Sequence, residues 1–361
     1  MPTPPVNPRK TGRPFKDRKG EDNTGPLRVL VTGAGTQLGY HLACRLAEGL
    51  VFGSDQKVHL ILYDAARMEG MMKTTERELL ESAPVPLNGV EVTSSEKAAF
   101  TNIDYAFLLQ GAPMQDQMEW KDFLIANVRI FKSQGKALAK HSKATTKVLV
   151  LAEPINTNTL IVAKYADPKV SAKNISGVIR LDHIHATAKA EVTTEDVTNV
   201  VIWGNHSSTQ FPDLSHAKIH KDGGWVPAHS VVDDEWFKRE FITEHQNRAA
   251  VRVPSQQERP PAHSMAKAAG DHAHDIFAGT SGKWVSMVVQ SEGSYGVPKE
   301  DLKSQDSKEN KVGAKSAMKD VSTMTVQPTK KSSNKGPGRK LSSKRKKKKG
   351  ASEEEKKVCV K

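Results

Sequence analysis

Three glycines at the end of a short apolar segment have a spacing that suggests chemistry. In VLVTGAGTQLG, residues 29–39, Gly33, Gly35 and Gly39 follow a β-branched run and precede a helical pattern. Such a strand-to-helix turn lets backbone N–H groups and a helix N-terminus face a pyrophosphate. The next apolar segment, KVHLILYD, ends in Asp64, where a carboxylate can accept hydrogen bonds from ribose hydroxyls and disfavour a 2′-phosphate. The pattern predicts a dinucleotide site that prefers NAD to NADP, although tight turns without nucleotides share the glycine spacing.

A loop without any cation is the second element of interest. The stretch GAPMQDQMEW, residues 111–120, follows the apolar run YAFLLQ and precedes a helical pattern. Loops that leave the carboxyl ends of parallel strands often carry the substrate contacts of α/β enzymes. Because this loop contains no Lys, Arg or His, the sequence predicts a substrate lid that lacks a cation for an acidic ligand.

Alternating strand and helix patterns must position these two elements. From Leu27 onward, short β-branched segments alternate with segments of helical period, which predicts α/β architecture with a doubly wound, Rossmann-type parallel sheet and right-handed crossovers. After residue 174 the rhythm becomes mixed and predicts a smaller α+β domain. Its expected elements are a strand at 199–204, a strand pair at 224–234, a helix at 263–277 and a strand at 283–293. The expected parts of the chain are a disordered linker at 1–26, a dinucleotide-binding domain at 27–176, a substrate domain at 177–302 and a disordered lysine-rich tail at 303–361.

The charge of the chain is concentrated in its ends. Residues 301–361 hold 19 Lys and Arg against 7 Asp and Glu, and residues 1–26 hold 6 against 3, so the total of +13 leaves −2 for residues 27–300. The cluster KKSSNKGPGRKLSSKRKKKKG, Lys330 to Gly350, is typical of a nuclear import signal, of an electrostatic contact to nucleic acid or an acidic membrane, or of a solvated tail without a partner. The basic charge therefore says little about the folded body.

Cysteine usage and hydropathy limit the class of protein. The two cysteines, Cys44 and Cys359, cannot form a disulfide framework or a thiolate metal site. No apolar run approaches the roughly 18 residues of a membrane span, and the N-terminus has no apolar signal-peptide core. We expect a soluble intracellular protein without a transmembrane segment.

Two His-x-His pairs raise the question of a metal. They are His183/His185 and His272/His274. Residues two apart do not share a helix face, and no carboxylate or cysteine completes either set. We therefore expect no metal site.

Eight collinear segments carry a resemblance to a known family. They are VLVTGA (29–34), VFGSDQ (51–56), KDFLIANVRIFKSQG (121–135), PINTNTL (154–160), RLDH (180–183), VVIWGNHSSTQFPD (200–213), DHAHDIF (271–277) and SYGVP (294–298). In these segments the chain resembles cytosolic-type malate dehydrogenases of the lactate/malate dehydrogenase family, over about three quarters of its length. The resemblance implies NAD as cofactor, hydride transfer between malate and oxaloacetate, and a homodimer.

The resemblance also implies the catalytic and cofactor residues. His206 matches the histidine that transfers the proton, and Asp182 matches the carboxylate that orients it. The implied cofactor contacts are the turn residues Gly33, Ala34, Gly35, Thr36, Gln37, Leu38 and Gly39, the ribose carboxylate Asp64, and Asn127 and Gln134. The family turn is similar to G-A-A-G-Q-I, whereas this chain reads G-A-G-T-Q-L. Thr36 thus replaces the second fingerprint glycine, and its Cβ is expected to weaken pyrophosphate binding.

The substrate positions depart further from the family pattern. Two arginines of the family lid match Met114 and Trp120, and a third arginine matches His185. Glu153 replaces the family's substrate-binding asparagine, while Ser264 matches a serine near the substrate pocket. A bidentate arginine–carboxylate contact cannot be reproduced by Met or Trp. We expect poor binding of a dicarboxylate.

The C-terminus is the other departure. After SYGVPKEDL the family continues with further strand and a long helix, whereas this chain enters its lysine-rich tail. The substrate domain is therefore expected to be truncated. Three interpretations stay open: a malate dehydrogenase-like oxidoreductase, a catalytically impaired paralogue that acts through its basic tail, and a reductase of an apolar or aromatic 2-oxo acid. The expected location is the cytoplasm, with nuclear import through the tail as a further hypothesis.

Overall fold

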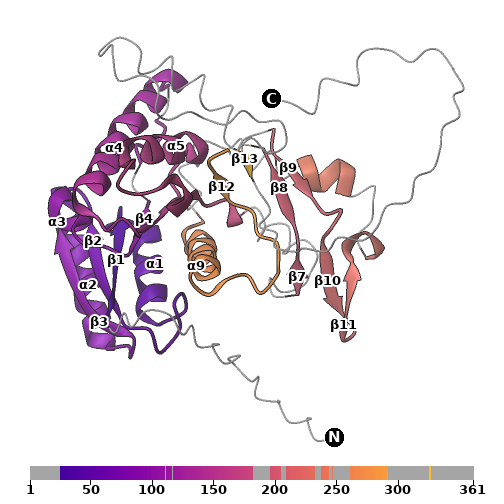
Figure 1. Cartoon of the computed structure of the whole chain (residues 1–361), viewed down its shortest axis with the longest axis horizontal. Coiled ribbons are helices and arrows are strands. Elements are labelled where there is room, and N and C mark those ends of the chain that lie inside the picture. Colours follow the sequence, from indigo (N-terminus) through magenta and orange to yellow (C-terminus); the bar gives the residue numbers. More distant parts are fainter. Residues whose placement is uncertain are drawn as a thin grey trace, which may run out of the picture.

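The computed structural model describes residues 25–109, 111–115, 117–181, 196–204, 209–231, 237–243, 246, 261–291 and 325–326. Its main sheet has eight strands in the order β13-β12-β6-β5-β4-β1-β2-β3 (Figure 1). The strands are β1 (Leu27–Thr32), β2 (Val58–Tyr63), β3 (Leu87–Thr93), β4 (Tyr105–Leu108), β5 (Lys147–Val150), β6 (Ile175–Gly177), β12 (Val288–Val289) and β13 (Thr325–Val326). Strands β1 to β6 pair in parallel, and β12 and β13 add antiparallel pairs at one edge. The predicted doubly wound sheet is confirmed.

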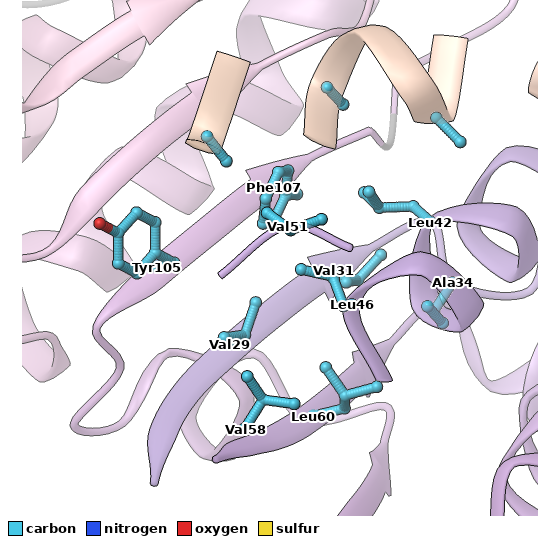
Figure 2. Packing of buried hydrophobic residues seen from close by; sticks show 14 of the residues in the cluster. Val29, Val31, Ala34, Leu42, Leu46, Val51, Val58, Leu60, Tyr105 and Phe107 are labelled. Atoms are coloured by element: carbon cyan, nitrogen blue, oxygen red, sulfur yellow. The ribbon is translucent and has the colours of Figure 1, made fainter. Parts of the chain in front are cut away.

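Helices cover both faces of this sheet. They are α1 (Gln37–Ala47), α2 (Glu69–Ser82), α3 (Glu96–Phe100), α4 (Trp120–His141), α5 (Ile155–Ala166) and α9 (Ala262–Ala278). Val29 and Val31 of β1 face the core under α1, α2 and α9 (Figure 2). Leu30 faces the core under α3, α4 and α5. Side chains alternate along a strand, so a strand covered on both sides must be apolar at consecutive positions. This explains the continuous run VLV.

The second half of the chain adds two small sheets and a third apolar cluster. The strands are β7 (Val197–Thr198), β8 (Val201–Trp203), β9 (Phe211–Asp213), β10 (Lys218–Lys221) and β11 (Gly224–Pro227), in the orders β11-β10-β7 and β8-β9. Short turns of 3-10 helix lie at Ala66–Met68, Ala172–Asn174 and Ala228–Ser230, and a π-helical turn lies at Phe237–Phe241. The strand pair expected within residues 224–234 instead joins β10 to β11. Asp222 and Gly223, with φ of 52° and 83°, form the turn between them, as hairpin turns require.

Helix α9 belongs spatially to the first sheet, although the sequence places it among the elements of the second domain. It packs beside α1, and its Ala266, Ala269 and Ala273 enter the same apolar cluster as β1 (Figure 1). Two polar contacts link it to β6 and to the segment that follows β6. The oxygen of Ser176 lies 2.9 Å from Nε2 of His272, and Arg180 donates to Asp275 at 2.8 Å. The limits of the predicted domains stay predictions.

The buried imidazole of His272 makes stability depend on pH. Burial, helped by the charge of Arg180, lowers its pKa from 6.5 to about 3. As pH falls below 6.5, this histidine binds a proton in the unfolded chain but stays neutral in the folded protein. The free energy of unfolding should therefore be highest above pH 6.5 and fall toward pH 3, by at most about 1.4 kcal/mol for each pH unit.

Urea unfolding at pH 7 and pH 5 measures this effect. The variant His272→Asn removes the titration, so its difference in stability between the two pH values should be smaller than that of the wild type. The matched variant His263→Asn changes an exposed histidine of the same helix and should retain the full difference. If the stability of His272→Asn depends on pH as strongly as that of the wild type, His272 is not the source of the pH dependence.

No helix within the described part of the chain is long and apolar enough to cross a membrane.

Among the same residues, no three His, Cys, Asp or Glu side chains gather as a metal site would need. His272 and His274 are engaged elsewhere: His272 with Ser176, and His274 through Nδ1 with the carbonyl oxygen of Val51 at 2.8 Å. The pair His183/His185 lies outside the described residues.

Candidate functional site

The glycine turn lies where the strand order reverses. β1 has β2 on one side and β4 on the other, and ligands of such sheets bind in the crevice at this switch point. Gly33 follows β1 with φ of 67°, a conformation that favours glycine. At Gly39 an added Cβ would lie 2.6 Å from the Cα of Ala34 and from the carbonyl oxygen of Gly33. The two glycines therefore allow the turn and bring α1 against it.

Thr36 caps α1 at the position where a fingerprint glycine was expected. Its φ of −90° and ψ of 165° are ordinary extended backbone, so the turn needs no glycine here. Its hydroxyl donates to the carbonyl oxygen of Gly33 at 2.8 Å and accepts from the N–H of Gly39 at 3.1 Å. The N–H groups of Gln37 and Leu38 have no hydrogen-bond partner within the described residues. These two donors suit a phosphate oxygen at the helix N-terminus.

Asp64 closes the other side of the turn. Its side chain is buried, and its two oxygens accept hydrogen bonds from the N–H of Gly35 at 3.1 Å and from the N–H of Ala65 at 2.7 Å. An added Cβ at Gly35 would lie 2.7 Å from the Cβ of Met68 and 3.2 Å from Asp64 Oδ2. Gly35 therefore lets the glycine turn and the carboxylate of Asp64, just after β2, meet directly.

The loop after β4 leads into α4 and carries the expected substrate positions. Met114 and Trp120 are both partly exposed. Trp120 is the first residue of α4, and its ring lies 5.2 Å from that of Phe123, one helical turn away. The described residues of this loop, 111–115 and 117–119, include no Lys, Arg or His. The described residues of this loop therefore offer no cation to an acidic ligand, and the roles of Met114 and Trp120 as substrate positions stay predictions.

Glu153 and Ser264 occupy different ends of the site region. Glu153 follows β5, is exposed, and accepts a hydrogen bond from the N–H of Ile155 at the start of α5. Ser264 lies in the first turn of α9 and donates to the carbonyl oxygen of Pro261 at 3.1 Å. Its neighbour His263 packs its ring 5.4 Å from that of His41 in α1. Ser264 therefore lies on the α1 side of the fold, and its predicted contact with substrate stays a prediction.

The two polar residues expected from α4 are more buried than a direct ligand contact requires. Asn127 is 0% exposed and Gln134 is 1% exposed, and Oε1 of Gln134 has no hydrogen-bond partner among the described residues. The amide of Asn127 contacts Ala112, at the start of the loop after β4. Their roles as cofactor contacts stay predictions.

Comparisons with known proteins agree with this geometry. Residues 27–177 match the lactate/malate dehydrogenase NAD binding domain, and residues 178–335 match the alpha/beta C-terminal domain of the same enzymes. The chain belongs to the lactate/malate dehydrogenase family. It is 48% identical to the cytoplasmic malate dehydrogenase of Caenorhabditis elegans over 281 residues, which cover 76% of this chain and 83% of the relative. It is 46% identical to the human cytoplasmic enzyme, with the same coverage.

Solved structures support the same family. The malate dehydrogenase of Naegleria fowleri has a TM-score of 0.69 and 36% identity, with 76% of this chain and 84% of that chain covered. The lactate dehydrogenase of Trichomonas vaginalis, in complex with NADH and oxamate, has a TM-score of 0.68 and 31% identity over 76% of this chain and 84% of that one. The predicted family, fold and NAD cofactor are confirmed.

The family match also fits the chemistry of the turn. A pyrophosphate needs close approach of backbone donors, and a ribose needs an acceptor. Gln37 and Leu38 offer the donors, and Asp64 offers a carboxylate beside the turn. NAD supplies, when bound, the hydride acceptor or donor of the family's chemistry. The residues of this lactate/malate dehydrogenase family member therefore fit the cofactor.

Asp64→Asn should weaken NADH and favour NADPH. The change keeps the size of the side chain but removes the charge that attracts ribose hydroxyls and repels a 2′-phosphate. A charge-assisted hydrogen bond of about 1.5 kcal/mol corresponds to a roughly tenfold higher Kd for NADH. Fluorescence titration with both cofactors measures the two affinities. Asp55→Asn, at an exposed carboxylate, should change neither, and an unaltered ratio in Asp64→Asn would disprove the ribose assignment.

The predicted proton-transfer residues lie outside the described residues. They are His206 and Asp182, and His185 lies outside as well. The structure describes their flanks: Arg180 on one side, and β8 with Gly204 at φ of 85° on the other.

The sequence did not predict the contact of Asn127 with Ala112 or the ion pair of Arg180 with Asp275. The segments RLDH and DHAHDIF contain both partners of that ion pair, but nothing in their spacing shows that they meet.

Proposed function

We propose that the protein is an NAD-dependent oxidoreductase of 2-hydroxy and 2-oxo acids whose use of oxaloacetate is strongly reduced. The observation that carries the proposal is a contrast within one site. The turn from Gly33 to Gly39 and Asp64 have the contacts that a dinucleotide site requires. Met114 and Trp120, by contrast, match the family arginines that bind the substrate carboxylates, and neither carries a charge. Malate and oxaloacetate each carry two carboxylates, so this contrast affects substrate binding and not the cofactor.

The proposed mechanism keeps the family's proton chemistry. His206 gives a proton to the carbonyl oxygen of the 2-oxo acid during reduction and takes it back during oxidation. Asp182 orients the imidazole and stabilises its protonated form. Glu153 adds a negative charge beside a substrate that is already negative, and His185 cannot reproduce the bidentate contact of an arginine. Proton transfer is thus retained, while the capture of a dicarboxylate is weakened.

An apolar 2-oxo acid is the second candidate substrate. The rings of Trp120 and Phe123 lie in a tilted contact, with centroids 5.2 Å apart, at the start of α4. Such aromatic side chains favour an aromatic ligand over a charged one, because aromatic rings bind other rings and offer no charge to a carboxylate. Phenylpyruvate represents this class.

Following NADH oxidation with oxaloacetate and with phenylpyruvate tests the proposed function. We expect slow turnover with both, and a kcat/KM for oxaloacetate at least about 1000-fold below that of an ordinary malate dehydrogenase, given about 2 kcal/mol for each of two missing contacts. Oxaloacetate turnover equal to that of the cytoplasmic relatives would refute the proposal. Faster turnover of phenylpyruvate would favour the second candidate.

The basic tail carries a third candidate function, as a binding element of a catalytically impaired paralogue. Residues 301–361 carry a net charge of +12 from 19 Lys and Arg against 7 Asp and Glu, which favours contact with polyanions such as nucleic acid. Binding of duplex DNA that weakens as salt increases, and disappears in a chain ending at residue 302, would support it. We further propose that the protein is a homodimer and lies in the cytoplasm. The charge cluster at residues 330–350 would also suit a nuclear import signal.

A further inference from the structure

A buried asparagine holds the start of the loop after β4. Asn127 lies on α4 and is 0% exposed. Its Oδ1 accepts from the N–H of Ala112 at 3.0 Å, and its Nδ2 donates to the carbonyl oxygen of the same residue at 3.1 Å. Nδ2 also donates to the carbonyl oxygen of Phe123 at 3.0 Å. One side-chain amide thus satisfies both backbone groups of Ala112, in the manner of a neighbouring strand.

The packing around Gly111 shows how closely this contact fits. A Cβ at Gly111 would lie 2.8 Å from Oδ1 of Asn127 on one side and 3.0 Å from the Cβ of Ala152 on the other. The loop therefore leaves β4 through a narrow passage between α4 and the segment that follows β5. Only a residue without a side chain fits there while the amide of Asn127 keeps its place.

The loop after β5 is held in a similar way. Asn158 of α5 is buried and donates through Nδ2 to the carbonyl oxygen of Ala152 at 2.8 Å. Ala152 in turn borders Gly111. The two loops that carry Met114 and Glu153 therefore begin side by side, each fixed by an asparagine from the helix that follows it.

We propose that Asn127 is a positioning residue of the substrate site: by binding both backbone groups of Ala112 it fixes the origin of the loop 111–119. The inference rests on the proposed function in that this loop borders the substrate. Asn127 reaches the substrate only through the loop. The alternative role, direct contact with the cofactor, is what the family resemblance implies for this position, and the two roles predict different results.

Hydrogen exchange measures the proposed contact without any need for turnover. In Asn127→Leu, which keeps the size of the side chain but forms no hydrogen bond, amide exchange in peptides covering residues 109–118 should rise by about tenfold or more. Peptides from β1 and α9 should exchange as in the wild type. Asn127→Asp keeps an acceptor for Ala112 but loses the donors, so its exchange should be intermediate. Asn88→Ala, at an exposed asparagine of β3, is the matched control and should change nothing.

A kinetic and binding comparison separates the two roles. If Asn127 positions the loop, Asn127→Asp should raise KM for the better of oxaloacetate and phenylpyruvate by about tenfold or more, while the Kd for NADH changes less than about threefold. Weaker NADH binding with unchanged exchange at residues 109–118 would overturn the proposal in favour of a cofactor contact. Faster exchange throughout β1 and α9 would overturn it in favour of a general role in the core. Absence of turnover would refute the proposed function but leave the exchange result to decide the role of Asn127.

Discussion

Restoring cations at the substrate positions should raise oxaloacetate turnover by roughly three orders of magnitude. The variant combines Met114→Arg, Trp120→Arg, His185→Arg and Glu153→Asn. Met114 and Trp120 are partly exposed, and Glu153 is exposed, so longer or neutral side chains at these sites do not need to enter a packed core. Counting only the two lid arginines, at positions 114 and 120, two regained contacts of about 2 kcal/mol each correspond to a roughly 1000-fold higher kcat/KM.

The control for this variant adds a cation to the same loop at the wrong place. Gln117 is exposed, and Gln117→Arg changes the loop charge without facing the expected carboxylates, so it should leave kcat/KM within about threefold. The loss of the Trp120–Phe123 ring contact should also lower the activity of the quadruple variant with phenylpyruvate. A folded quadruple variant that binds NADH but gains no oxaloacetate activity would contradict the proposed function and point to the second domain, which we expect to be truncated, as the limiting defect.

Replacing Arg180 should cost more stability than any surface change. The side chains of Arg180 and Asp275 are 17% and 14% exposed, and their charged atoms lie 2.8 Å apart. Burial raises the pKa of Asp275, and the guanidinium of Arg180 opposes that rise. In Arg180→Met the carboxylate stays buried without its cation, which costs about 3–5 kcal/mol in the free energy of unfolding. Urea unfolding at pH 7 measures this loss in the free energy of unfolding.

Two further variants show whether the missing partner causes the loss. Arg180→Met combined with Asp275→Leu should recover much of the stability, because no buried charge remains. Lys73→Met breaks the exposed pair of Lys73 with Glu69 and should leave the unfolding midpoint unchanged. Equal losses in Arg180→Met and in the double variant would show that the lost packing of the arginine stem, and not the unpaired carboxylate, is responsible.

The sequence predicts the sheet best where both faces of a strand are covered. β1, β2, β4 and β5 read as continuous apolar runs because helices lie on both sides of them. The sequence pattern does not predict β3, and the reason lies in its residues. LNGVEVT is an edge strand that is only partly buried, so polar and apolar residues mix without a clear period. The strand expected over residues 283–293 is only Val288–Val289 in the structure.

In the candidate site, contacts between residues close in sequence could be predicted, whereas contacts between distant residues could not. The glycine turn and Asp64 follow from patterns that are local in sequence, and the structure brings them together. The ordinary backbone of Thr36 depends on the turn, and the burial of Asn127 depends on the contact of α4 with the loop after β4. No spacing rule contains either. Arg180 and Asp275 are 95 residues apart in sequence, so only the fold shows that they pair.

Calorimetric titration in two steps tests the central claim most directly. NADH is first titrated into the full chain, and hydroxymalonate, a dicarboxylate, is then titrated into the NADH complex. We expect saturable binding of NADH at a single site per chain, because the Asp64 carboxylate contacts the glycine turn, and no measurable heat from the dicarboxylate. Failure of NADH to bind, or binding of hydroxymalonate to the NADH complex at micromolar concentration, would contradict it.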